Sequence, residues 1–152
     1  MSSPDNISLR IPAKADYVSV VRLAISGIAA RMQFTIDEIE DIKVSISEAC
    51  TNVIQHAYEE DPSASNSIID IQINIINNEL EIIVSDYGKG FDLAILGTRE
   101  QKEKSKEKLG LGLGLTFIES LMDTTSFQST LGKGTVIQMK KQSPNLATSS
   151  ST

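Results

Sequence analysis

Apolar residues recur at two spacings along the chain, and the spacing distinguishes predicted helices from predicted strands. In residues 16–32 and 36–58 they recur every three or four positions, which is typical of an amphipathic helix with one buried face. Thr35 is followed three residues later by Glu38, a capping-box pair that predicts the start of the second helix. A third apolar stripe with a helical period begins at Leu115.

Elsewhere apolar and polar residues alternate, which predicts strands with one buried and one wetter face. The predicted strands are residues 6–11, 69–75, 79–85, 124–130 and 135–140. Asn77-Asn78 is expected to form a hairpin turn, because Asn tolerates positive φ. The pattern therefore predicts an α/β fold, a two-layer sandwich whose mixed, mostly antiparallel sheet is covered on one face by three helices.

The length of 152 residues suits one domain. We expect this domain to span residues 1–142 and to be followed by a Ser/Thr-rich, disordered tail over residues 143–152. Cys50 is the single cysteine, so no internal disulfide can form. It is predicted to be a small buried residue on the apolar face of the second helix, and a reducing cytoplasm is the expected location.

Charge and hydropathy argue against two kinds of partner. Fourteen basic and twenty acidic residues give a formal net charge of −6. Direct binding to nucleic acid is disfavoured, because it depends on Lys and Arg neutralising phosphates. No apolar run approaches the roughly 20 residues of a membrane span, and the first residues lack the basic and apolar regions of a secretion signal. We therefore expect neither a nucleic acid nor a membrane as a direct partner.

Three polar side chains follow one another at helical spacing on the second predicted helix. Glu48, Asn52 and His56 occupy positions i, i+4 and i+8, and are expected to form a stripe that points away from the apolar face. An amide oxygen can coordinate Mg²⁺, and a carboxylate can accept a proton from an attacking hydroxyl group. On this segment alone a solvated polar helix face is the commoner explanation, and His56 is equally a phosphate-facing donor or a capping residue.

Glycine motifs follow one predicted strand and precede the third predicted helix. In Asp86-Tyr-Gly-Lys-Gly90, a carboxylate fixed at a strand end can accept a hydrogen bond from an exocyclic amine such as that of adenine. In Gly110-Leu-Gly-Leu-Gly114, glycines before a helix expose N–H groups that suit phosphate oxygens. The dinucleotide fingerprint and the P-loop do not fit the second motif, since the former needs glycine at position 115 and the latter Lys-Ser/Thr after its last glycine.

Residues 97–108 lie between the two glycine motifs and contain five cationic residues without apolar periodicity. They are expected to form either a plain solvated loop or a mobile lid whose cations meet a triphosphate.

These motifs, together with Gly134-Thr135 at the start of the last predicted strand, resemble those of the Bergerat-fold (GHKL) ATPases. The resemblance covers roughly residues 6–140. Within that superfamily it is closest to the anti-sigma-factor serine kinases of the RsbW type. Residues 17–23, 37–43 and 47–58 carry the closer likeness.

The resemblance implies a homodimeric serine kinase that uses ATP and Mg²⁺. Such a kinase sequesters an alternative sigma factor and phosphorylates a serine of its anti-anti-sigma antagonist, a STAS-domain protein. The alternatives are a related switch kinase that acts upstream on another STAS-domain protein, and a binding module that uses ATP without kinase activity.

Residue roles also follow from the resemblance, by position. Glu48 is expected to be the catalytic base, Asn52 the Mg²⁺ ligand, and Arg22 a contact for partner proteins. Asp86 is expected to anchor adenine. The expected nucleotide-binding positions are Asn52, His56, Asp86, Gly88, Gly90, Gly110, Gly112, Gly114 and Thr135. The charged segment 97–108 departs from the family pattern, so none of its residues is assigned a role.

Overall fold

The computed structural model describes residues 3–57, 67–88 and 112–144. The elements are β1 (Asp5–Pro12), α1 (Val18–Arg31), α2 (Ile36–Asn52), β2 (Ile68–Ile76), β3 (Glu79–Asp86), α4 (Gly112–Leu121), β4 (Thr124–Thr130) and β5 (Gly134–Gln142). A short 3₁₀ turn (Ala15–Tyr17) precedes α1, and a π-helical segment (Val53–Ala57) continues α2. The predicted lid and two of the predicted glycines, Gly90 and Gly110, lie outside the described residues.

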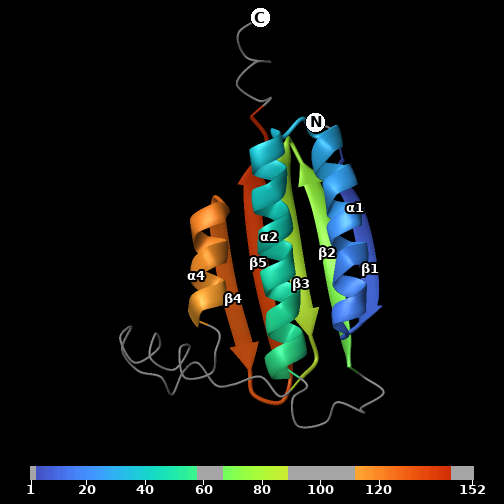
Figure 1. Cartoon of the computed structure of the whole chain (residues 1–152), viewed down its shortest axis with the longest axis vertical. Helices are drawn as coiled ribbons and strands as arrows, with labels where there is room; N and C mark the ends of the chain where they lie inside the picture. The colour runs from blue at the N-terminus through green and yellow to red at the C-terminus, as the bar shows by residue number, and fades with distance from the viewer. Residues whose placement is uncertain (1–2, 58–66, 89–111, 145–152) are drawn as a thin grey trace, which may run out of the picture.

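Five strands form one sheet in the order β1-β2-β3-β5-β4, and α1, α2 and α4 cover one of its faces (Figure 1). The predicted two-layer sandwich is therefore confirmed. The four strand pairings described are all antiparallel, so the parallel pairing that a mixed sheet would contain is not found among them. β3 and β4 run in the same direction, but β5 lies between them.

The insertion of β5 follows from the side chains of the last two strands. β5 places Ile137 and Met139 in the core, with exposed fractions of 3% and 0%, whereas β4 consists mainly of Thr, Ser and Gln. A polar strand is better suited to an edge, where one side of its backbone meets water. The hairpin therefore folds with β5 inward.

Local signals in the sequence set several boundaries. Thr35 accepts a hydrogen bond from the Glu38 backbone N–H (3.1 Å), and the Glu38 carboxylate accepts one from the Thr35 N–H (2.9 Å), so the predicted capping box is present. Asn77 and Asn78 both have positive φ, 51° and 69°. Two consecutive positive φ values are typical of a type I′ hairpin turn, which confirms the predicted turn between β2 and β3.

The core lies between the sheet and the three helices. β2 contributes Ile69, Ile71 and Ile73 to it, and each is at most 1% exposed. Cys50 of α2 is also fully buried, as predicted, and burial raises the pKa of its thiol to about 12. At neutral pH this thiol therefore stays protonated and serves as packing. Among the helices that the structure describes, none is long and apolar enough to cross a membrane.

Ser143 was predicted to begin the disordered tail, and this boundary is wrong. The residue is 1% exposed, its N–H donates to the carbonyl oxygen of Asn78 (2.8 Å), and its hydroxyl donates to that of Met32 (2.6 Å). Met32 follows the last residue of α1, where carbonyl groups lack helical partners. The amino-acid composition of the tail could not predict that one of its serines would make this hydrogen bond. The rest of the predicted tail, from residue 145, lies outside the described residues.

Candidate active site

Four elements that carry the predicted motifs meet at one end of the molecule. The C-terminal ends of α2 and β3 and the first residues of α4 and β5 all lie at the lower end in Figure 1. Asn52 is the last residue of α2, and Asp86 is the last residue of β3. Gly112 begins α4, and Thr135 is the second residue of β5. Motifs far apart in the sequence are thus brought to one place.

Asp86 is a buried carboxylate at this end. It continues the alternation of Leu80, Ile82 and Val84, which face the helices, and is 5% exposed. Its Oδ1 accepts a hydrogen bond from the Gly88 N–H (2.9 Å), and the Thr135 N–H also donates to the carboxylate. Burial raises the pKa of Asp86, and the two N–H donors oppose this shift. No described Lys or Arg pairs with this carboxylate, so its charge is available to a ligand.

The raised pKa of Asp86 predicts a pH dependence of stability. In the folded state the pKa lies above its ordinary value near 3.8, so the folded protein holds this proton more tightly than the unfolded chain. The resulting contribution to stability is fully present below the ordinary pKa and is lost as pH rises through the folded pKa. We expect the free energy of unfolding of wild type, minus that of Asp86→Ala, to decrease over this window in urea titrations without nucleotide. A constant difference would contradict this prediction.

Gly134 brings the start of β5 directly against the end of β3. Its φ is +104°, and a Cβ atom at this position would lie 2.0 Å from the Asp86 carbonyl oxygen and 2.9 Å from the Tyr87 Cα. Such distances are far below van der Waals contact, so only glycine allows this approach. The absent side chain thereby lets the neighbouring Thr135 N–H reach the Asp86 carboxylate.

Gly134→Ala should therefore be more destabilising than Gly132→Ala. Both glycines have positive φ, but a Cβ at Gly132 would meet nothing within 4 Å. We expect Gly132→Ala to lower the free energy of unfolding by about 1–2 kcal/mol through backbone strain. Gly134→Ala should cost roughly 1–3 kcal/mol more through steric displacement of Asp86. Urea denaturation measures both, and equal losses would show that the close approach is not constrained.

Glu48 and Asn52 occupy the last turns of α2. Asn52 was predicted to lie on a polar stripe pointing away from the apolar face, but it is only 7% exposed, and its Nδ2 has no hydrogen-bond partner among the described residues. Glu48 is half-buried. A buried amide without a partner is costly unless a ligand or water satisfies it. Neither side chain therefore lies on a fully solvated face of the helix.

His56 does not continue this row at α-helical spacing. The helix changes to π geometry at Val53, so His56 is not aligned with Glu48 and Asn52 as the α-helical spacing predicted. π segments interrupt α-helices frequently at functional sites. The structure places the His56 backbone within this segment, and its side chain lies outside the description.

α4 begins at Gly112 rather than at the predicted Leu115, so Gly112 and Gly114 lie in its first turn. Backbone N–H groups of a first turn have no helical partners, and the helix dipole favours an anion there. The opposite end of α4 is tied to the sheet, because the Lys141 ammonium donates to the Leu121 carbonyl oxygen (2.6 Å). α4 thus has its N-terminus at the end where Asp86 and Asn52 lie.

Comparison with known proteins identifies the family. Residues 11–141 match the histidine kinase-like ATPase domain. Serine-protein kinase RsbW of Bacillus subtilis (strain 168) is 40% identical over 135 residues, which cover 86% of this chain and 82% of that protein. The RsbW of Bacillus licheniformis is 38% identical over 141 residues, covering 90% and 85%. The chain belongs to the RsbW-type serine kinases of the histidine kinase-like ATPase family.

Solved structures share the fold of this RsbW-type kinase. The SiaB-SiaC complex from Pseudomonas aeruginosa matches with a TM-score of 0.61 at 15% identity, over 89% of this chain and 87% of the matched chain. The histidine kinase domain of the Erythrobacter litoralis EL346 blue-light activated histidine kinase matches with a TM-score of 0.52 at 19% identity, over 91% and 64%. At these identities the likeness concerns the fold alone.

The family binds ATP, and the donor set at this end of the RsbW-type kinase fits a magnesium–nucleotide. Among the described residues no group of three or more His, Cys, Asp or Glu side chains could hold a metal ion. Mg²⁺ needs no such cage, because it keeps several waters and takes ligands from phosphates. Rotation of the Asn52 amide by 180° exchanges its oxygen and nitrogen, so its unpartnered position can present Oδ1 to the ion. A bound ion would neutralise phosphate charge there.

Arg22 is the one predicted functional residue that belongs to a different element. It is exposed on α1, which packs against α2 on the β1 side of the sheet (Figure 1). Neighbouring apolar side chains are exposed too, with Leu23 at 75% and Val20 at 48%. In the RsbW-type kinase this helix surface is thus separate from the buried carboxylate and amide.

Two features of the site were not predicted from the sequence. The donation of the Thr135 N–H to Asp86 was missed, because the resemblance implied only that Thr135 is a nucleotide-binding position. The steric role of Gly134 was also missed, although the Gly-Thr pair itself was noticed. The signal was present in both cases as a glycine at the start of a strand, where a close backbone approach is a common reason for glycine.

Proposed function

We propose that this RsbW-type kinase transfers the γ-phosphate of ATP to a serine of a STAS-domain anti-anti-sigma protein, and that it sequesters an alternative sigma factor. The observation that carries the nucleotide part is the buried Asp86 carboxylate, with which no described Lys or Arg pairs. It lies at the same end of the molecule as the Asn52 Nδ2, which has no hydrogen-bond partner among the described residues. Burial of a carboxylate without a cation and of an amide nitrogen without a partner is costly, and a nucleotide with its metal ion would satisfy both groups.

Each residue in this proposal has a distinct role. The Asp86 carboxylate accepts a hydrogen bond from the 6-amino group of adenine while Gly88 and Thr135 hold it in place. Asn52 binds Mg²⁺, and the first turn of α4 faces the phosphates. Glu48 accepts the proton of the serine hydroxyl as its oxygen attacks the γ-phosphorus. The bond to the β-phosphate oxygen breaks, and ADP leaves.

Partner proteins are proposed to bind at α1. Arg22 lies on its exposed surface beside Leu23 and Val20, whose exposed apolar side chains would be buried by a partner. Aromatic, Arg and apolar residues of this kind commonly anchor protein interfaces. The homodimeric state and the use of Mg²⁺ are carried over from the resemblance to the family, and the cytoplasmic location is the one expected for a chain with a single cysteine.

Transfer of label from [γ-³²P]ATP tests the proposal. Incubated with a STAS-domain antagonist, the kinase should yield phosphoserine on that protein. The unphosphorylated antagonist should displace the sigma factor from the kinase. Label on the STAS-domain protein without sigma binding would indicate the upstream switch kinase instead. Nucleotide binding with no label transfer would indicate a binding module and contradict the kinase proposal.

A further inference from the structure

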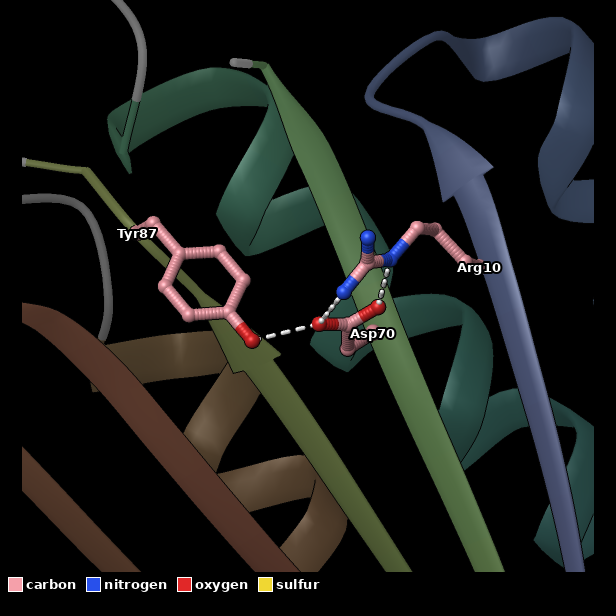
Figure 2. Close-up of polar contacts among 3 residues, drawn as sticks. All are labelled: Arg10, Asp70 and Tyr87. Atoms are coloured by element: carbon pink, nitrogen blue, oxygen red, sulfur yellow. Dashed lines mark hydrogen bonds and ion pairs between the residues drawn. The ribbon is translucent and has the colours of Figure 1, made fainter.

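Three polar side chains form a cluster on the sheet face that the helices leave uncovered. Arg10 of β1 and Asp70 of β2 are cross-strand partners, and Tyr87 follows the last residue of β3. Arg10 donates to Asp70 twice, from Nε to Oδ1 (2.7 Å) and from Nη2 to Oδ2 (3.1 Å), and the Tyr87 hydroxyl donates to the same Oδ2 (Figure 2). We refer to these three residues as the open-face cluster.

The cluster acts on the segment that carries the buried carboxylate. Tyr87 stands between Asp86, whose side chain faces the helices, and Gly88, whose N–H donates to Asp86. Gly134 packs against the backbone of Asp86 and Tyr87 from the neighbouring strand. The open-face cluster therefore holds this turn on one side of the sheet while the Asp86 contacts hold it on the other.

The Tyr87 side chain lies at the surface of the open face. The side chain is 53% exposed and borders an open hollow of about 470 Å³, which is lined also by Ser8, Gln72 and Ser85. The bond from its hydroxyl to Asp70 ties the end of the ring to β2.

Asp70 is itself held in one orientation. A bidentate Arg–carboxylate pair fixes both position and plane, which a single hydrogen bond does not. Arg10 lowers the pKa of Asp70, and so does the Tyr87 hydroxyl, while burial opposes them. The carboxylate is therefore a charged, oriented acceptor at neutral pH. Because the Arg10 side chain is largely exposed, the net contribution of the pair to stability is small, and its main effect is geometric.

We propose that Tyr87 and Asp70, the latter oriented by Arg10, are positioning residues for nucleotide binding that hold the Asp86–Gly88 turn from the open face of the sheet. The inference rests on the proposed role of Asp86 as the adenine anchor. It assigns a function in the nucleotide site to three side chains that lie on the face opposite the helices.

Single substitutions on the open face test the proposal, and a carboxylate-to-amide change elsewhere on the same face is the control. Asp70→Asn and Tyr87→Phe should each raise the dissociation constant for the ATP analogue AMPPNP by roughly three- to tenfold, while the urea midpoint changes little. Glu81→Gln is the control, because Glu81 lies on β3 and the same face but bonds to Asn74 and Gln138, away from the turn. It should leave the dissociation constant unchanged.

Further readouts separate positioning from general destabilisation. The double variant of Asp70→Asn and Tyr87→Phe should bind no more weakly than the weaker single variant, because both substitutions act through the same contact. KM for ATP should rise more than kcat falls. Should Tyr87→Phe fail to fold, Arg10→Gln tests the same arrangement, and it should also weaken binding.

Asp86→Ala distinguishes failure of the inference from failure of the proposed function. If Asp86→Ala weakens AMPPNP binding but Asp70→Asn and Tyr87→Phe do not, the open-face cluster has no positioning role and the inference is overturned. If Asp86→Ala itself leaves binding unchanged, the adenine-anchor proposal is overturned and the inference with it. An equal loss of affinity in Glu81→Gln would also overturn the inference, since the effect would then be common to the whole face.

Discussion

Glu48→Gln should lower the rate of phosphate transfer by roughly 10²–10⁴-fold while ATP binding stays close to that of wild type. The substitution keeps the size and hydrogen-bonding capacity of the half-buried side chain but removes the base. Sigma-factor binding should survive, because the proposed partner surface lies around Arg22 on α1. Single-turnover transfer from labelled ATP measures the chemical step, and calorimetry with AMPPNP measures binding.

Glu40→Gln is the matched control for this variant. Glu40 lies on the same helix, is largely exposed and pairs with Lys43 through a surface contact of 3.1 Å. Its replacement should leave the transfer rate unchanged. If Glu48→Gln instead phosphorylates the antagonist at the wild-type rate, another residue is the base and the role assigned to Glu48 is wrong.

Asp86→Ala should weaken ATP binding by about 5- to 150-fold, equivalent to roughly 1–3 kcal/mol for the loss of a buried acceptor. The same carboxylate should make wild type prefer ATP to GTP by a similar factor, because guanine presents a carbonyl oxygen where adenine presents an amine. Calorimetric titration with both nucleotides measures the preference, and circular dichroism checks that the variant is folded. Equal affinity of wild type for ATP and GTP would refute the role of Asp86.

Strand alternation contains the information that sets the direction of the Asp86 side chain. Leu80, Ile82 and Val84 are buried on the helix-covered face of β3, and Asp86 follows them at the same spacing of two residues. The local pattern is therefore enough to show which face of the sheet this carboxylate lies on. Helix spacing placed Glu48 and Asn52 on one helix in the same way. Both predictions depend only on the geometry of single elements.

Other features depended on contacts that no local pattern contains. The burial of Asn52 results from packing at the end of α2, and the inward position of β5 depends on the choice between two strands of one hairpin. Arg10 and Asp70 are 60 positions apart in the chain, and each alone is an ordinary polar residue of an alternating strand. Their pairing follows from strand register, which the sequence pattern did not specify.

The most direct test of the account is the location of the nucleotide. A titration of ¹⁵N-labelled protein with Mg²⁺ and AMPPNP, followed by amide correlation spectra, should shift the backbone N–H signals of Gly88 and Thr135 and the side-chain amide of Asn52. Signals of Gln72 and Gln138 on the open face should move little. Shifts concentrated on those open-face residues, with Gly88, Thr135 and Asn52 unmoved, would contradict a nucleotide site where α2, β3 and β5 meet.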